Sequence, residues 1–129
     1  DYTARLIAEH AASCVVDRVG APNLALIAED LLLGGTPDEA AIAADIAPAF
    51  FDDARGKTDT LVLGCTHYPF LSDAILRLAP WKVSLIDPAP AIARQAARLF
   101  TGGGDGRSDA FVTSAAALAH YQPVFARFG

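Results

Sequence analysis

One short stretch of the sequence limits the fold more than any other. The apolar run Leu61–Leu63 has strand character, ends in Gly64, and is followed at once by Cys65, a threonine and a histidine. Pro69 then stands where a helix would begin. A parallel strand presents its functional groups at its carboxyl end, beside the amino end of the next helix, which favours anions. The pattern therefore predicts a parallel α/β layer with a reactive thiol in a crevice.

The rest of the chain alternates in the same way. Four segments rich in β-branched or aromatic residues are expected strands: Cys14–Val19, Thr60–Leu63, Val83–Ile86 and Phe111–Thr113. Five segments with helical spacing are expected helices: Tyr2–Ala11, Asn23–Leu33, Asp38–Phe51, Phe70–Leu78 and Ala89–Phe100. This alternation predicts an α/β fold with a doubly wound parallel sheet. Thr36 and Pro37 are expected to open one helix, as N-cap and first residue, and residues 54–57 are expected to form a loop.

Length and composition narrow the class of protein. The chain has 129 residues, 53% of them hydrophobic and 19% charged, which suits one globular domain. A net charge of −5 argues against a nucleic-acid partner, because phosphate binding needs a basic patch. Two cysteines without a CxxC pair indicate a reducing cytoplasm. No apolar run approaches the roughly 18 residues that would span a bilayer, so no membrane role is expected.

The residues around the thiol favour catalysis over packing. A lone cysteine is more often a small buried hydrophobe. Here Gly64 permits close approach to the backbone, Thr66 can hydrogen-bond a substrate carboxylate, and His67 can move a proton near neutral pH. We therefore interpret Cys65 as an active-site residue.

At this point a family resemblance becomes specific. The stretch Asp59–Leu71, which contains Gly-Cys-Thr-His-Tyr-Pro, resembles the second catalytic-cysteine motif of glutamate racemases. Weaker similarity to the same family extends over Pro22–Glu29, Val83–Ala89 and Phe111–Ser114. The resemblance thus covers nearly the whole chain, and its central motif is the specific part.

The resemblance implies a cofactor-independent, metal-free isomerase that interconverts L- and D-glutamate with two cysteines. One cysteine removes the α-proton as thiolate, and the other returns a proton from the opposite face. It implies that Cys65 is one of the pair, that His67 assists it, and that Thr66 and Glu29 serve substrate binding. It also implies a bacterial, cytoplasmic enzyme that supplies D-glutamate for peptidoglycan and cell-wall biogenesis.

The chain departs from the family where the first cysteine would stand. The Cys-Asn-Thr motif and the Asp-Ser pair of the amino-terminal half are not in the sequence, and Cys14 is interpreted as structural. The chain also lacks methionine and begins with Asp1. We therefore expect a fragment, inactive alone, whose partner is the missing amino-terminal half. Residues 1–86 would form most of the second domain, and residues 87–129 would return to the first; a homodimer is left open.

Two carboxylates, Glu29 and Asp87, each have two competing interpretations. The segment of Glu29 departs from the family pattern at Ala21, at Ala25 and at the inserted Leu31–Leu33, so a solvated helix residue is the competing interpretation. Asp87 is interpreted as a helix N-cap in preference to a catalytic group.

Several alternatives stay open. A related aspartate or hydantoin racemase is disfavoured by the residues that follow Cys65. A cysteine hydrolase is disfavoured because no nucleophile-elbow pattern is found. A non-catalytic or degenerate racemase-like domain is the alternative from another functional class. His10 and His120 are interpreted as surface or structural residues, because neither has partners at metal-ligand spacing.

Overall fold

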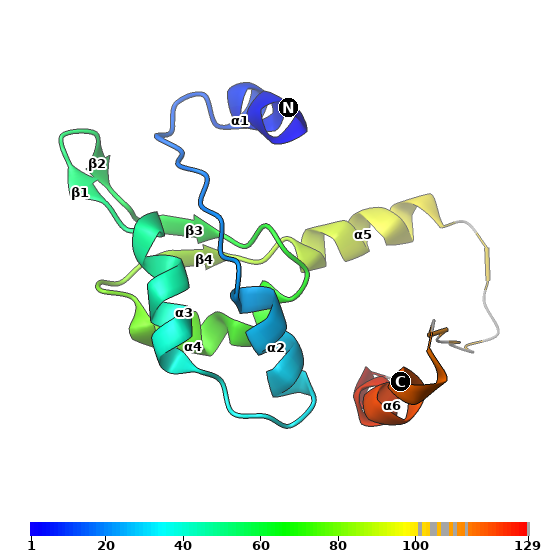
Figure 1. The fold of residues 1–129 in the computed structure, drawn as a ribbon. Helices are drawn as coiled ribbons and strands as arrows, with labels where there is room; N and C mark the ends of the chain where they lie inside the picture. Colours follow the sequence, from blue (N-terminus) through cyan, green and yellow to red (C-terminus); the bar gives the residue numbers. More distant parts are fainter. Residues whose placement is uncertain (101, 104–105, 107–108, 110, 113, 129) are drawn as a thin grey trace.

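The computed structural model describes residues 1–100, 102–103, 106, 109, 111–112 and 114–128 (Figure 1). The α-helices of this part are α1 (Tyr2–His10), α2 (Leu24–Leu32), α3 (Glu39–Ile46), α4 (Ser72–Leu78), α5 (Ala89–Leu99) and α6 (Ala115–Phe128). Two 3₁₀ turns are η1 (Ala47–Ala49) and η2 (Tyr68–Leu71). The strands are β1 (Asp52–Asp53), β2 (Gly56–Lys57), β3 (Thr60–Val62) and β4 (Ser84–Ile86).

A parallel strand pair organises the fold. Strands β3 and β4 are parallel, with Leu61 opposite Leu85, and the chain between them passes through η2 and α4. Parallel neighbours need such a crossover because a tight turn cannot join them. The Leu63 N–H extends the ladder by donating to the Ile86 carbonyl at 3.0 Å. The α/β class is confirmed, as are the strands expected near residues 60–63 and 83–86.

Three helices cover one side of this pair. In Figure 1, α2, α3 and α4 lie together beneath β3 and β4, whereas α5 runs away from them. The buried apolar core they share consists of Leu24, Ala28, Ile42, Ile46, Leu63, Leu71, Ala74 and Ile75. Each fully buried isoleucine or leucine stabilises the fold by about 1.5–3 kcal/mol through the apolar surface it removes from water. Leu63 belongs to this core and directly follows β3, so its burial fixes the position at which the Gly64–Cys65 turn begins.

An aspartate determines where α3 begins. The Asp38 side chain accepts a hydrogen bond from the Ala41 N–H at 3.0 Å and so caps α3. The expectation that Thr36 would be the N-cap and Pro37 the first helical residue is therefore wrong. The cap lies two residues after Thr36, because an aspartate carboxylate reaches the free N–H groups of the first turn.

Two further boundaries differ from expectation. The helix expected over Asp38–Phe51 ends at Ile46 and continues only as η1, since Pro48 has no N–H for a helical bond. The loop expected at residues 54–57 is instead the tip and second strand of the β1–β2 hairpin. Gly56 adopts a φ of +134° in this hairpin, a conformation that residues with a side chain rarely take.

The first and last expected strands are not found. Residues 14–19 run outside any sheet, and Val15, Val16 and Val19 are exposed. Phe111 and Val112 are also outside strands, and Thr113 lies outside the described residues. Residues with β-propensity form a strand only where a partner strand accepts their hydrogen bonds. Helix α6 was not expected from the sequence, because Pro123 lies within it and proline disfavours the interior of a helix.

Candidate active site

The candidate site begins where β3 ends. Leu63 is buried in the core, and the chain then turns through Gly64, Cys65, Thr66 and His67. Two backbone bonds close the turn: Tyr68 N–H donates to the Cys65 carbonyl at 3.3 Å, and Phe70 N–H donates to the His67 carbonyl at 3.1 Å. The helix expected to start at Phe70 instead starts at Ser72, because Phe70 lies within η2, the tight 3₁₀ segment through which the chain leaves the turn.

The turn brings the thiol and the imidazole together. The Cys65 Sγ lies 3.8 Å from the His67 Nδ1, and the Thr66 Oγ1 lies 3.4 Å from the same nitrogen. Cys65 and His67 are half-buried, whereas Thr66 is exposed. When Nδ1 is unprotonated it can accept the thiol proton, and when it is protonated it can stabilise a thiolate. The structure thus brings together the three side chains that the motif placed in sequence.

A small cavity opens beside the thiol. It has a volume of about 170 Å³ and lies between the residues that follow β3 and those that follow β4. Its lining residues are Leu63, Gly64, Cys65, Thr66, Pro69, Asp87, Pro88, Ala89 and Ile92. The carboxyl ends of adjacent parallel strands are the usual place for a ligand in open α/β sheets. Cys65 and Thr66 line this cavity, whereas His67 does not.

Asp87 contributes to the cavity wall and to the start of α5. Its Oδ1 accepts a hydrogen bond from the Ala89 N–H at 2.8 Å. This bond agrees with the capping role favoured from the sequence, although the backbone places Pro88 at the N-cap position.

Glu29 lies on α2 and contacts the last helix. The Tyr121 hydroxyl donates a hydrogen bond to its Oε1, and this bond to a carboxylate raises the pKa of Tyr121 above its usual value. Among the described residues, no hydrogen bond joins Glu29 to His67. The site role given to Glu29 therefore stays a prediction, and the structure connects it with α6.

Tyr68 is a member of the site that the sequence analysis did not single out. Its hydroxyl donates to the Ala21 carbonyl at 3.1 Å, and its ring packs against the core. Burial raises the pKa of Tyr68, and negative charge at Cys65 and Asp45 raises it further, so the hydroxyl keeps its proton near neutral pH. Its place directly after His67 was the only sequence signal.

The remaining candidates lie elsewhere. Cys14 is exposed and lines a different groove of about 800 Å³. Cys65 does not line that groove. His10 is exposed beside Glu9, and the His120 ring stacks edge-on against Tyr121 with ring centroids 5.6 Å apart. These positions agree with surface or structural roles.

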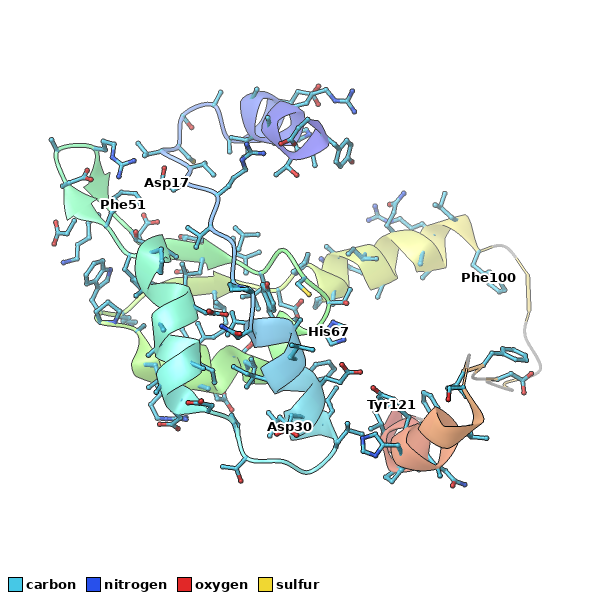
Figure 2. The ribbon with its side chains drawn as sticks, in the orientation of Figure 1. Asp17, Asp30, Phe51, His67, Phe100 and Tyr121 are labelled. Atoms are coloured by element: carbon cyan, nitrogen blue, oxygen red, sulfur yellow. The ribbon has the colours of Figure 1, made fainter. Side chains whose placement is uncertain are left out.

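In Figure 2, His67 lies on the connection between β3 and α4, near the beginning of α2. Within the described ranges there is no group of three or more His, Cys, Asp or Glu side chains that could hold a metal ion. Over the same residues no helix combines the length and apolar character needed to cross a membrane.

The fold and the site together define a class of protein: an α/β protein with a cysteine at the end of a parallel strand. The chain is 48% identical over 104 residues to the glutamate racemase of Brucella canis, covering 81% of this chain and 38% of that protein. It is 47% identical over 98 residues to the glutamate racemase of Agrobacterium fabrum, covering 76% of this chain and 36% of that protein. No protein-family model matches the chain.

A solved structure shows the same relationship. The crystal structure of Escherichia coli glutamate racemase, in complex with L-glutamate and the activator UDP-MurNAc-Ala, superposes with a TM-score of 0.79 at 30% sequence identity. The match covers 100% of this chain and 50% of the Escherichia coli chain. The chain is therefore homologous to part of glutamate racemase, and the resemblance inferred from its motif is confirmed. It spans between about a third and a half of the length of these relatives.

Proposed function

We propose that this chain is the Cys65-bearing part of a glutamate racemase, an isomerase that interconverts L- and D-glutamate without a cofactor. One observation carries the proposal: Cys65 and His67, 3.8 Å apart, stand beside a strand-end cavity in a chain homologous to glutamate racemases. The cytoplasm is the proposed location, and D-glutamate for bacterial peptidoglycan is the proposed product. The proposed partner is the remainder of the racemase.

The proposed chemistry is a pair of proton transfers. As thiolate, Cys65 accepts the α-proton of one enantiomer, and the electron pair of the broken C–H bond stays on the α-carbon next to the carboxylate. A second thiol on the opposite face, outside this chain, donates its proton to that carbon. The product is the mirror image; Cys65 has gained the proton taken from the substrate, the other cysteine has given its own proton to the α-carbon, and the reverse reaction restores both.

The other side chains of the turn have supporting roles in this proposal. His67 holds or takes the thiol proton through Nδ1, while Thr66 donates a hydrogen bond to the substrate at the mouth of the cavity. We also propose that Glu29 binds substrate; it lies on α2, where its carboxylate contacts Tyr121 of α6. No metal or cofactor takes part in the proposed reaction.

Exchange of the substrate α-proton tests the proposal. The chain joined to the racemase half that it lacks is incubated with L- or D-glutamate in deuterated water, and deuterium at Cα is followed by NMR. We expect exchange of both enantiomers, and loss of racemisation by at least about 10³-fold in Cys65→Ala, because a two-base reaction cannot proceed with one base. Cys14→Ser is the matched control and should keep full activity.

A non-catalytic racemase-like domain is the second candidate. It is favoured by one observation, that His67 does not line the cavity that Cys65 borders. The same assay separates the two: a joined protein that exchanges neither enantiomer supports the non-catalytic domain and overturns the racemase.

A further inference from the structure

The Cys65–His67 turn stands between two hollows of the molecule. On one side, Cys65 and Thr66 line the cavity of about 170 Å³. On the other, Tyr68 lines the groove of about 800 Å³ beneath the chain segment before α2. Tyr68 does not line the thiol cavity, and its hydroxyl contacts the segment before α2 instead.

The Tyr68 hydroxyl joins this turn to a segment distant in sequence. It donates to the Ala21 carbonyl, 47 positions away, at 3.1 Å, while the Tyr68 N–H holds the Cys65 carbonyl at 3.3 Å. One residue therefore binds the thiol-bearing turn through its backbone and an outside anchor through its side chain.

The anchor is itself firmly held. Ala21 packs against the core two residues before Asn23, whose N–H donates to the buried carboxylate of Asp45 at 2.7 Å. The Leu24 N–H donates to the same oxygen at 3.1 Å. The acceptor of the Tyr68 bond thus belongs to a segment fixed by packing and by a buried cap, which suits a fixed reference point for the turn.

We propose that Tyr68 is a positioning residue for the proton-transfer pair. Its hydrogen bond to Ala21 holds the turn so that the Cys65 thiol faces the cavity with His67 beside it. This inference rests on the proposed function for its effect on turnover, whereas the anchoring itself does not depend on that function. Removing the hydroxyl loosens the turn without removing a group that contacts substrate.

The kinetic test is Tyr68→Phe in the joined protein, which keeps the ring and its packing. We expect kcat to fall about tenfold, with KM within about twofold, because a displaced thiol affects the transition state more than substrate binding. Tyr2→Phe removes the same hydroxyl from an exposed residue of α1 and should change neither constant. An unchanged kcat, or a raised KM with unchanged kcat, overturns the positioning role.

Amide hydrogen exchange on the 129-residue chain tests the anchor separately. In Tyr68→Phe the amides at positions 68 and 70 should exchange at least about fivefold faster, while Ile42 in α3 serves as the unaffected reference. If the variant unfolds, the measurement is repeated in trimethylamine oxide, which favours the folded state without replacing the hydroxyl. Unchanged exchange overturns the anchor. An inert wild-type joined protein overturns only the racemase function.

Discussion

At the scale of single residues, the buried Asp45 holds the start of α2, next to the residue that the Tyr68 hydroxyl contacts. The residue is 7% exposed, and its carboxylate accepts hydrogen bonds from Asn23 N–H at 2.7 Å, Asn23 Nδ2 at 2.9 Å and Leu24 N–H at 3.1 Å. It therefore caps α2 from another helix. The anchor of Tyr68 lies immediately before this cap, so α2 and the thiol-bearing turn depend on the same carboxylate.

Removing that carboxylate should be costly. We expect Asp45→Ala to lower the free energy of unfolding by about 3 kcal/mol, because it leaves the buried Leu24 N–H and two part-buried Asn23 donors without an acceptor. Asp38→Ala is the matched control: it removes an exposed cap with one hydrogen bond and should cost about 1 kcal/mol. Urea unfolding of both variants measures the difference. Equal losses would contradict the special role of Asp45.

The residues of the Cys65–His67 turn could be predicted from the sequence, whereas the residues that hold this turn in place could not. Cys65, Thr66 and His67 were predictable because a strand end and a tight turn keep neighbours in sequence close in space. The bonds of Tyr68 to Ala21 and of Asp45 to Asn23 span 47 and 22 positions, and no local pattern encodes them. Only the packing of α2 against η2 and α3 creates these partners.

At the scale of elements, the β1–β2 hairpin is held by charge. Arg55 pairs with Asp53 at 2.9 Å and with Asp17 of the preceding segment at 3.0 Å. Hydrogen bonds from the Arg55 side chain and then from its backbone N–H lower the pKa of Asp53. The hairpin is thereby tied to the extended segment that leads to α2.

This pairing gives the hairpin a defined pH dependence. Because the folded-state pKa of Asp53 is depressed, its stabilising contribution is fully present above the unfolded value of about 3.9. The contribution is lost as the pH falls through the lowered folded-state pKa. Arg55→Gln should move the Asp53 midpoint upward in a carboxyl NMR titration. Arg77→Gln, which removes a cation paired with Glu39 on α3, should leave that midpoint unchanged, and an unmoved midpoint in Arg55→Gln would contradict the assignment.

Elements were predictable where local pattern and tertiary contacts agree. The βαβ unit from β3 to β4 follows from its apolar runs and the amphipathic segment between them. Residues 14–19 have strand composition without a strand partner in the described structure, and α6 contains Pro123 yet is helical. Both errors arise because hydrogen-bond partners and docking surfaces decide the outcome, and neither is written in a short window of sequence.

At the scale of the whole molecule, exposed apolar side chains gather on the β3–β4 strand pair and along α5. Val62 and Ile86 on the strand pair are 66% and 48% exposed, and Ile92, Leu99 and Phe100 on or next to α5 are 61%, 73% and 69% exposed. Under the proposed function, the remainder of the racemase would pack against these surfaces. The boundary between residues 86 and 87 stays a prediction; it falls between β4 and α5, where the chain leaves the packed helices.

The last prediction concerns the chain by itself. Among the described residues Cys65 is the cysteine that lines the candidate cavity, whereas Cys14 borders the other groove, and the proposed reaction needs a second thiol on the opposite face of the substrate. We expect the isolated chain to racemise glutamate at no more than about 10⁻³ of the rate of the joined protein, and Cys14→Ser to change nothing. Circular dichroism after long incubation with L-glutamate measures the loss of optical activity. Adding the separate missing half should restore activity only if the two parts associate across these apolar surfaces. Robust turnover by the isolated chain would instead show that Cys65 needs no opposing cysteine.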